Sequence, residues 1–150
     1  MATYVQISDE IAQRLSTVDN IGRVYPFQRN IADAQKLKEL CWDPQQERIA
    51  TWWISREGWR DEQSSNIENT RSSVFVLIGV MAVEDDKQTE LIFQKVCDDV
   101  ATEFRAQTSL NSAVELTRPL QARLIGYSTF AGILCHTAQL TMEIQEFYTS

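Results

Sequence analysis

Residues 73–83 read SVFVLIGVMAV, and this apolar run decides the fold. Successive side chains of a β-strand point to opposite faces, so a strand with this sequence is apolar on both sides. A run of this kind is typical of a central strand. We therefore expect it to be covered on both faces, or to be covered by helices on one face and by a neighbouring subunit on the other.

Two further segments predict long strands beside this one. Residues 48–55, RIATWWIS, are rich in β-branched and aromatic side chains. Trp52 and Trp53 are neighbours, so a sheet with only one buried face would hold at most one of them in its core. The last segment alternates apolar and polar residues from residue 134 onward, which predicts a strand with one face in the core. The expected core face carries Leu134, Ala138, Leu140, Met142 and Ile144, and the other face carries Cys135, Thr137, Gln139, Thr141, Glu143 and Gln145.

Helices are predicted in three places. The first begins near Thr3 and Gln6, which have the spacing of a capping box, and Ser8 followed by Asp9 and Glu10 offers a second start. A shorter one is expected after Asn30, and the strongest pattern covers residues 87–106, after an acidic turn at residues 84–86. Their inward faces are Ile7, Ile11 and Leu15 in the first, Ala34, Leu37, Leu40 and Cys41 in the second, and Ile92, Phe93, Val96, Cys97, Val100 and Phe104 in the third.

Weaker signals complete the pattern. A short strand is expected before Pro26, and another within residues 116–127, starting near Pro119. Residues 108–112 should form a polar connection, and residues 128–132 a turn. The order of elements predicts one domain over residues 1–150 with an α+β fold: two layers, with a mostly antiparallel sheet and helices packed on one face.

Composition limits the classes of function. The chain has 150 residues, a net charge of −7 and a pI of about 4.7, which argues against a general nucleic-acid binder or a ligand of anionic membranes. It has no apolar run of about 20 residues, and its N-terminus lacks the pattern of a secretory signal, so neither a membrane span nor a signal peptide is expected. Its cysteines are Cys41, Cys97 and Cys135, and this wide spacing favours free thiols.

Reactive chemistry is hard to find in the sequence. His136 is the single histidine, and Cys135 next to it would point to the opposite face of a strand. Cys97 could reach His136 if its helix lies over the strand, although a structural histidine is the favoured interpretation. The acidic pairs at residues 85–86 and 98–99 fit helix capping and a solvated helix face. We therefore expect no enzyme, no cofactor and no metal.

The polar segment between the first two long strands is the main candidate for function. Residues 58–73 are far longer than an ordinary hairpin loop and carry many hydrogen-bonding groups, so we expect a loop that contacts a large partner. A hairpin tip without a role is the alternative. Interleaved Trp and Arg residues from Arg48 to Arg60 could also contact nucleic acid, but nearby carboxylates favour core packing and a protein interface. The expected interface residues are Arg56, Trp59, Arg60, Asp61, Glu62, Asn66, Asn69 and Arg71.

The whole layout resembles the tail terminator, or minor tail, proteins of long-tailed bacteriophages. The features that carry the resemblance are the N-terminal amphipathic helix, the Trp-containing strand with its extended hairpin, the strand SVFVLIGVMAV, the helix KQTELIFQKVCDDVATEF and the final strand LCHTAQLTMEIQEFYTS. The short helix near residues 34–41 departs from that pattern.

The resemblance implies a structural virion protein that forms a ring, most simply a hexamer. Such a ring caps the tail tube, stops its polymerisation and provides the joining surface for the head. The implied partners are copies of itself, the tail tube protein, head–tail connector proteins and, in a contractile tail, the sheath protein. The implied location is the virion tail or neck, after assembly in the bacterial host cytoplasm. A head–tail connector or neck protein and an unrelated ligand-binding α+β module remain as alternatives.

Overall fold

The computed structural model describes residues 1–63, 65–105, 110 and 116–149, and it has the expected α+β class. The helices are α1 (Tyr4–Leu15), α2 (Ala34–Cys41) and α3 (Thr89–Arg105), with a 3-10 turn η1 (Asp85–Lys87) before α3. The strands are β1 (Arg23–Tyr25), β2 (Trp42–Asp43), β3 (Arg48–Gln63), β4 (Glu68–Ala82), β5 (Leu116–Thr117), β6 (Gln121–Phe130) and β7 (Ile133–Thr149). None of the helices in these described ranges is long and apolar enough to cross a membrane.

One sheet contains the long strands in the order β1-β3-β4-β7-β5, while β6 pairs with another part of β7 and β2 with β3. The β1–β3 pair is parallel and the other pairs are antiparallel. β4, which contains the run SVFVLIGVMA, pairs with β3 on one side and with β7 on the other. The expectation of a central strand in a mostly antiparallel sheet is therefore confirmed.

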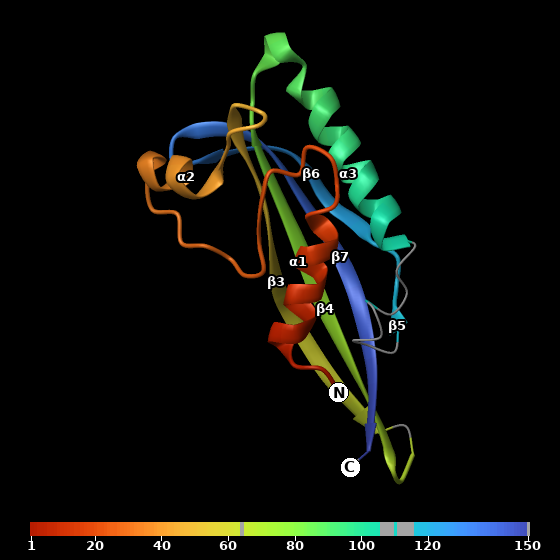
Figure 1. Cartoon of the computed structure of the whole chain (residues 1–150). Coiled ribbons are helices and arrows are strands. Elements are labelled where there is room, and N and C mark those ends of the chain that lie inside the picture. Colours follow the sequence, from red (N-terminus) through yellow and green to blue (C-terminus); the bar gives the residue numbers. More distant parts are fainter. Residues whose placement is uncertain (64, 106–109, 111–115, 150) are drawn as a thin grey trace.

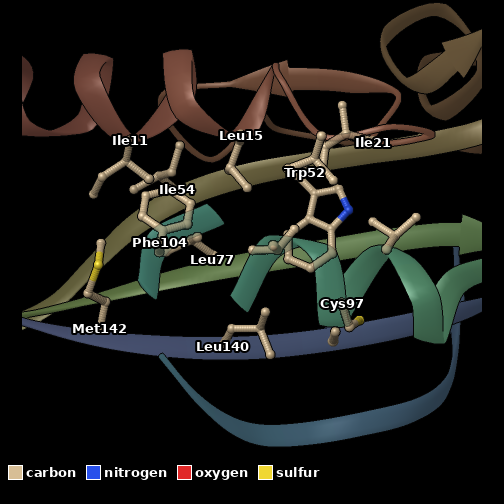
Figure 2. Packing of buried hydrophobic residues seen from close by; sticks show 14 of the residues in the cluster. Ile11, Leu15, Ile21, Trp52, Ile54, Leu77, Cys97, Phe104, Leu140 and Met142 are labelled. Carbon is tan, nitrogen blue, oxygen red and sulfur yellow. The ribbon is translucent and has the colours of Figure 1, made fainter. Parts of the chain in front are cut away.

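Helices α1 and α3 cover one face of the sheet (Figure 1). Thr3 caps α1 through the expected capping box with Gln6. Figure 2 shows how the first core forms, with α1 above β3 and α3 against the same face. Its labelled residues are Ile11, Leu15, Ile21, Trp52, Ile54, Leu77, Cys97, Phe104, Leu140 and Met142.

The opposite face also has cover, which differs from the expectation of helices on one face. Leu37 and Cys41 of α2 pack against Ile49 of β3, on the face away from the first core. Trp53 packs there with Val80 and Cys135, and its ring meets that of Phe130 edge-on at 6.4 Å. Trp52 and Trp53 are consequently both buried, because each face of β3 has its own cover.

The polar segment expected to be a loop is instead paired strand. β3 continues to Gln63 and β4 begins at Glu68, and the two strands stay in register to the pair Gln63↔Asn69. The end of β7 pairs with β4 over the same length, to Glu68↔Thr149. We call this three-stranded extension the β-arm: residues 58–63, 68–73 and 145–149. Figure 1 shows it projecting beyond the helices. β4 is paired on both sides within the arm, by β3 and by β7, so the arm can stay extended without apolar alternation.

Smaller differences concern the ends of elements. Asp33, rather than Asn30, caps α2 by accepting a hydrogen bond from the Lys36 amide at 2.8 Å. β6 extends to Phe130, which leaves a tight turn at residues 131–132. Leu134 is exposed rather than in the core, because it lies beside that turn at the rim of the sheet. Apart from Leu110, the expected connection at residues 108–112 lies outside the described residues.

Candidate protein interface on the β-arm

One face of the β-arm brings together three of the predicted interface residues. The Arg71 guanidinium of β4 contacts the Asp61 carboxylate of β3, with Nε–Oδ1 at 2.7 Å and Nη2–Oδ2 at 3.0 Å. The same guanidinium lies over the Trp59 ring, 4.0 Å from its centroid. Half of the Trp59 surface remains exposed, at 50%. Trp59 therefore presents an exposed aromatic surface that a cation–π contact with Arg71 holds in place. Aromatic residues and arginine are enriched at protein interfaces.

Charge pairing shifts the titration of this face. The hydrogen bond from Arg71 holds the pKa of Asp61 below its usual value of 3.8, and it raises the pKa of Arg71. Loss of hydration and the neighbouring Asp61 carboxylate raise the pKa of Tyr148 on β7. Asp61 and Arg71 are therefore both charged at neutral pH.

The N-terminus of α1 fastens the base of the arm. The Arg56 guanidinium lies over the Tyr4 ring at 5.0 Å, and that ring stacks on Phe75 at 5.9 Å. The Ala2 amide donates to the Glu146 carboxylate at 3.0 Å, and Glu146 is buried. Arg56 thus serves to anchor the base, and the outer part of the arm projects from a fixed point.

The second face of the arm carries the other predicted charges. Neighbouring strand residues point to opposite sides, so Arg60 and Glu62 lie away from Asp61. Arg60 and Glu62 pair with each other, with Nε–Oε1 at 2.7 Å, and both are exposed. Arg123 of β6 pairs with Glu57 at the base of the arm on β3. The eight predicted residues therefore do not form one cluster but divide between the base, the two faces and the tip of the arm.

The tip of the arm includes residues that the sequence reasoning missed. Asn66 is exposed in the turn, where the Glu68 amide donates to the Ser65 hydroxyl at 3.0 Å. Asn69 faces Gln63 on one side and Tyr148 on the other. Met1, Ile67 and Phe147 are exposed and line a shallow groove of about 580 Å³. The strand predicted for the C-terminal segment continues beyond its alternating residues to Thr149. Extending that prediction would have placed Phe147 and Tyr148 in the arm.

His136 forms a separate constellation under the start of α3. Its Nε2 lies 2.8 Å from the Thr89 hydroxyl, and its Nδ1 lies 3.3 Å from the Glu90 carboxylate. Phe93 and Tyr127 lie against its ring, at 5.6 and 5.1 Å. Burial lowers the pKa of His136, and the nearby Glu90 opposes this shift without cancelling it.

This geometry resembles the order hydroxyl–imidazole–carboxylate, but it suits a structural connection better than a reaction. Thr89 is 1% exposed, and its hydroxyl also accepts a hydrogen bond from the Glu84 amide at 3.0 Å. A nucleophile needs access for its substrate, which this hydroxyl lacks. Cys97, considered above as a partner of His136, is buried in the first core, and burial raises its pKa to about 12. The constellation joins the beginning of α3 to β7.

The described part of the chain contains no group of three or more His, Cys, Asp or Glu residues arranged to hold a metal ion. Comparison with known proteins gives no family: neither a protein-family model nor a curated protein sequence matches this chain.

Proposed function

We propose that this protein is a ring-forming structural component of a bacteriophage tail that caps the tail tube, stops its polymerisation and presents the joining surface for the head. The observation that carries the proposal is the β-arm. It projects past the helical layer, it is fastened at its base, and it presents the half-exposed Trp59 beside paired charges. Such an arm can reach a neighbouring subunit or a tube while the body of the domain stays unchanged.

Strand edges on the arm support assembly with other chains. Within the described residues, β3 has no strand partner on its outer side beyond residue 53. Dense charges and the irregularity between Arg56 and Gly58 protect this edge against indiscriminate pairing. An unpaired edge strand whose charged side chains disfavour non-specific pairing suits a subunit that assembles only with specific partners. In a closed ring, contacts between unlike surfaces satisfy such edges without open-ended growth.

A shortened arm tests the proposal. Deleting residues 60–63 and 69–72 removes four opposed pairs and joins Trp59 and Ser73, which already face each other, to the existing turn. We expect the body to fold, as measured by circular dichroism and the unfolding midpoint, and tail completion to fail. Negative-stain electron microscopy would then show long, unregulated tubes. Normal tails from the shortened protein would reject the proposal.

The same images separate a second assignment. Finished tails that lack heads would identify a head–tail connector or neck protein instead. An unrelated ligand-binding module is the candidate from another class, and the cavity beside Trp53, described below, favours it. A protein that stays monomeric alone and in the presence of tail tubes would support that module.

A further inference from the structure

A polar cavity lies at the end of the molecule that carries β1 and α2. It measures about 380 Å³, a size within the range of small-molecule sites. Its walls come from the irregular segment between β1 and α2, from β3 and from the end of β6. The residues that line it are Gln28, Arg29, Asn30, Ile31, Trp53 and Phe130.

Trp53, which lines this cavity, carries an unsatisfied hydrogen-bond donor. Its side chain is 4% exposed, and its indole Nε1 is buried without a hydrogen-bond partner among the described residues. A buried N–H without an acceptor is destabilising, and native proteins rarely retain one without a reason. The indole has one donor and no acceptor, so only a group with a lone pair can satisfy it.

Arg29 supplies a positive charge at the same cavity. Its guanidinium lies over the rings of Tyr25, at 4.7 Å, and Phe27, at 5.3 Å. These rings hold the cation in place without neutralising it, and within the described ranges Arg29 makes no ion pair with a carboxylate. Among the residues that the structure describes, none of those lining the cavity is acidic.

We infer that this cavity binds a ligand that carries a carboxylate beside a flat apolar group. Arg29 pairs with the carboxylate, the Trp53 N–H donates to one of its oxygens, and the side chains of Ile31 and Phe130 contact the apolar part. Amide groups of Gln28 and Asn30 offer further donors. Because Nε1 is shielded in the present conformation, binding requires a local shift of the side chains that cover it. This inference does not rest on the proposed role in tail assembly.

The Trp53 indole provides a direct readout in the full-length protein. Nuclear magnetic resonance of a ¹⁵N-labelled sample reports the indole N–H of each tryptophan, and Trp53→Phe identifies the Trp53 signal. The probes are benzoate and its neutral analogue benzamide, which has nearly the same shape. We expect benzoate to move the Trp53 signal saturably, with an affinity of about millimolar. Benzamide can accept the same hydrogen bond but has no charge to pair with Arg29, so it should bind about tenfold or more weakly.

Matched variants test the role of the cation. Arg29→Gln should weaken benzoate binding by about tenfold or more, because a charge-assisted hydrogen bond is lost. Arg23→Gln removes a cation from β1 that does not line this cavity, and it should leave binding intact. Equal shifts with benzamide, equal binding by Arg29→Gln, or an unmoved Trp53 signal in the folded protein would each overturn the inference.

A second pair of probes distinguishes the source of the carboxylate. Acetyl-phenylalanine with a free carboxylate imitates the C-terminus of a peptide, and its amide is the control. Tighter binding of acetyl-phenylalanine than of benzoate assigns the cavity to the end of a protein chain. Tighter binding of benzoate assigns it to a small free carboxylic acid.

Discussion

Arg71 of β4 forms a two-pronged ion pair with Asp61 of β3, with N–O distances of 2.7 and 3.0 Å, at a place where the sheet has no helix above it. The two residues are direct partners across the ladder. Trp59 lies under the same guanidinium. The body of the sheet has an apolar core beside it, whereas here the ordered side chains are this cluster, so we expect the cluster to help hold the arm in register.

Replacing Arg71 should therefore loosen the arm and leave the body intact. Arg71→Gln is expected to speed amide exchange at residues 58–63 and 68–73 by about two- to fivefold, the effect of one well-formed surface pair. Hydrogen-exchange mass spectrometry measures this change, and Arg60→Gln is the control on the opposite face. Unchanged exchange in the arm of Arg71→Gln would show that backbone pairing alone fixes it.

The same pair gives the arm a pH dependence. The folded pKa of Asp61 is lowered, so its stabilising contribution is complete above the ordinary value of 3.8 and is lost as pH falls through the lower folded value. Exchange in the arm should accelerate in acid beyond its intrinsic pH dependence. Asp61→Asn should remove that excess.

Gly79 of β4 allows close packing of Trp52. A Cβ atom added at residue 79 would lie 2.3 Å from Cε2 of Trp52, and this indole is 1% exposed and cannot move aside. Gly79→Ala should lower the free energy of unfolding by about 1–3 kcal/mol, as overpacking does in well-packed cores. Urea unfolding measures the change. Gly126→Ala on β6 is the control, because an added Cβ meets nothing there within 4 Å; equal stability of both variants would contradict this account.

The sequence predicted the body of the fold better than its edges. Alternation on β7 and the helical spacing of Ile7, Ile11 and Leu15 follow from burial on a single face, and burial leaves a pattern in the sequence. Trp53 and Cys135 are buried with Tyr25, Ile31 and the end of β6, while α2 covers Ile49, and this second cover depends on how distant segments meet. No local signal contains this information.

The arm was missed for a different reason. Residues 58–63 and 68 are exposed and residues 69–71 are half-buried, so little apolar burial marks the strands and their polar composition is the same for a loop and for a paired strand. Of the predicted interface residues, Trp59, Asp61 and Arg71 meet on one face because the register places them there. Arg60 and Glu62 take the other face for the same reason. Only the register of β3 against β4 shows which of the predicted residues lie on each face of the arm.

His136 should make stability depend on pH near neutrality. Burial lowers its folded pKa below the ordinary 6.5, so its contribution is complete above pH 6.5 and declines as pH falls toward the folded value. The Glu90 carboxylate faces the ring and partly offsets the lowering of the His136 pKa, so it narrows the pH range over which stability is lost. Thr89, Phe93 and Tyr127, which also contact the ring, carry no charge. The free energy of unfolding should therefore fall more between about pH 7.5 and about pH 5 for the natural chain than for His136→Gln. Equal losses would contradict the prediction.

The cysteines should be inert in the folded protein. Burial is the main cause that raises the pKa of each thiol, to about 12 for Cys97 and about 11 for Cys135, and upward for Cys41 as well. All are buried, and the thiolate is the reactive form. A disulfide reagent such as DTNB should label none of them before unfolding and all of them in denaturant. Rapid labelling of the native protein would reveal an opening of the core.

Trp59 and Arg60 separate the two faces of the arm as interfaces. They are neighbours on β3 and point to opposite sides, so single substitutions test one face each. If the Trp59 face contacts the neighbouring subunit or the tube, Trp59→Ala should weaken association by about 30-fold, the effect of losing a 2 kcal/mol aromatic anchor. Arg60→Ala should have little effect, since rim charges contribute weakly.

Light scattering measures self-association of both variants, and a binding assay measures their affinity for tail tubes. The Arg71→Gln protein is included because it keeps the Trp59 indole but removes the guanidinium that lies over it. The reverse result, with Arg60→Ala the damaging change, would place the interface on the face that carries Glu62, and association untouched by either variant would remove the arm from the interface.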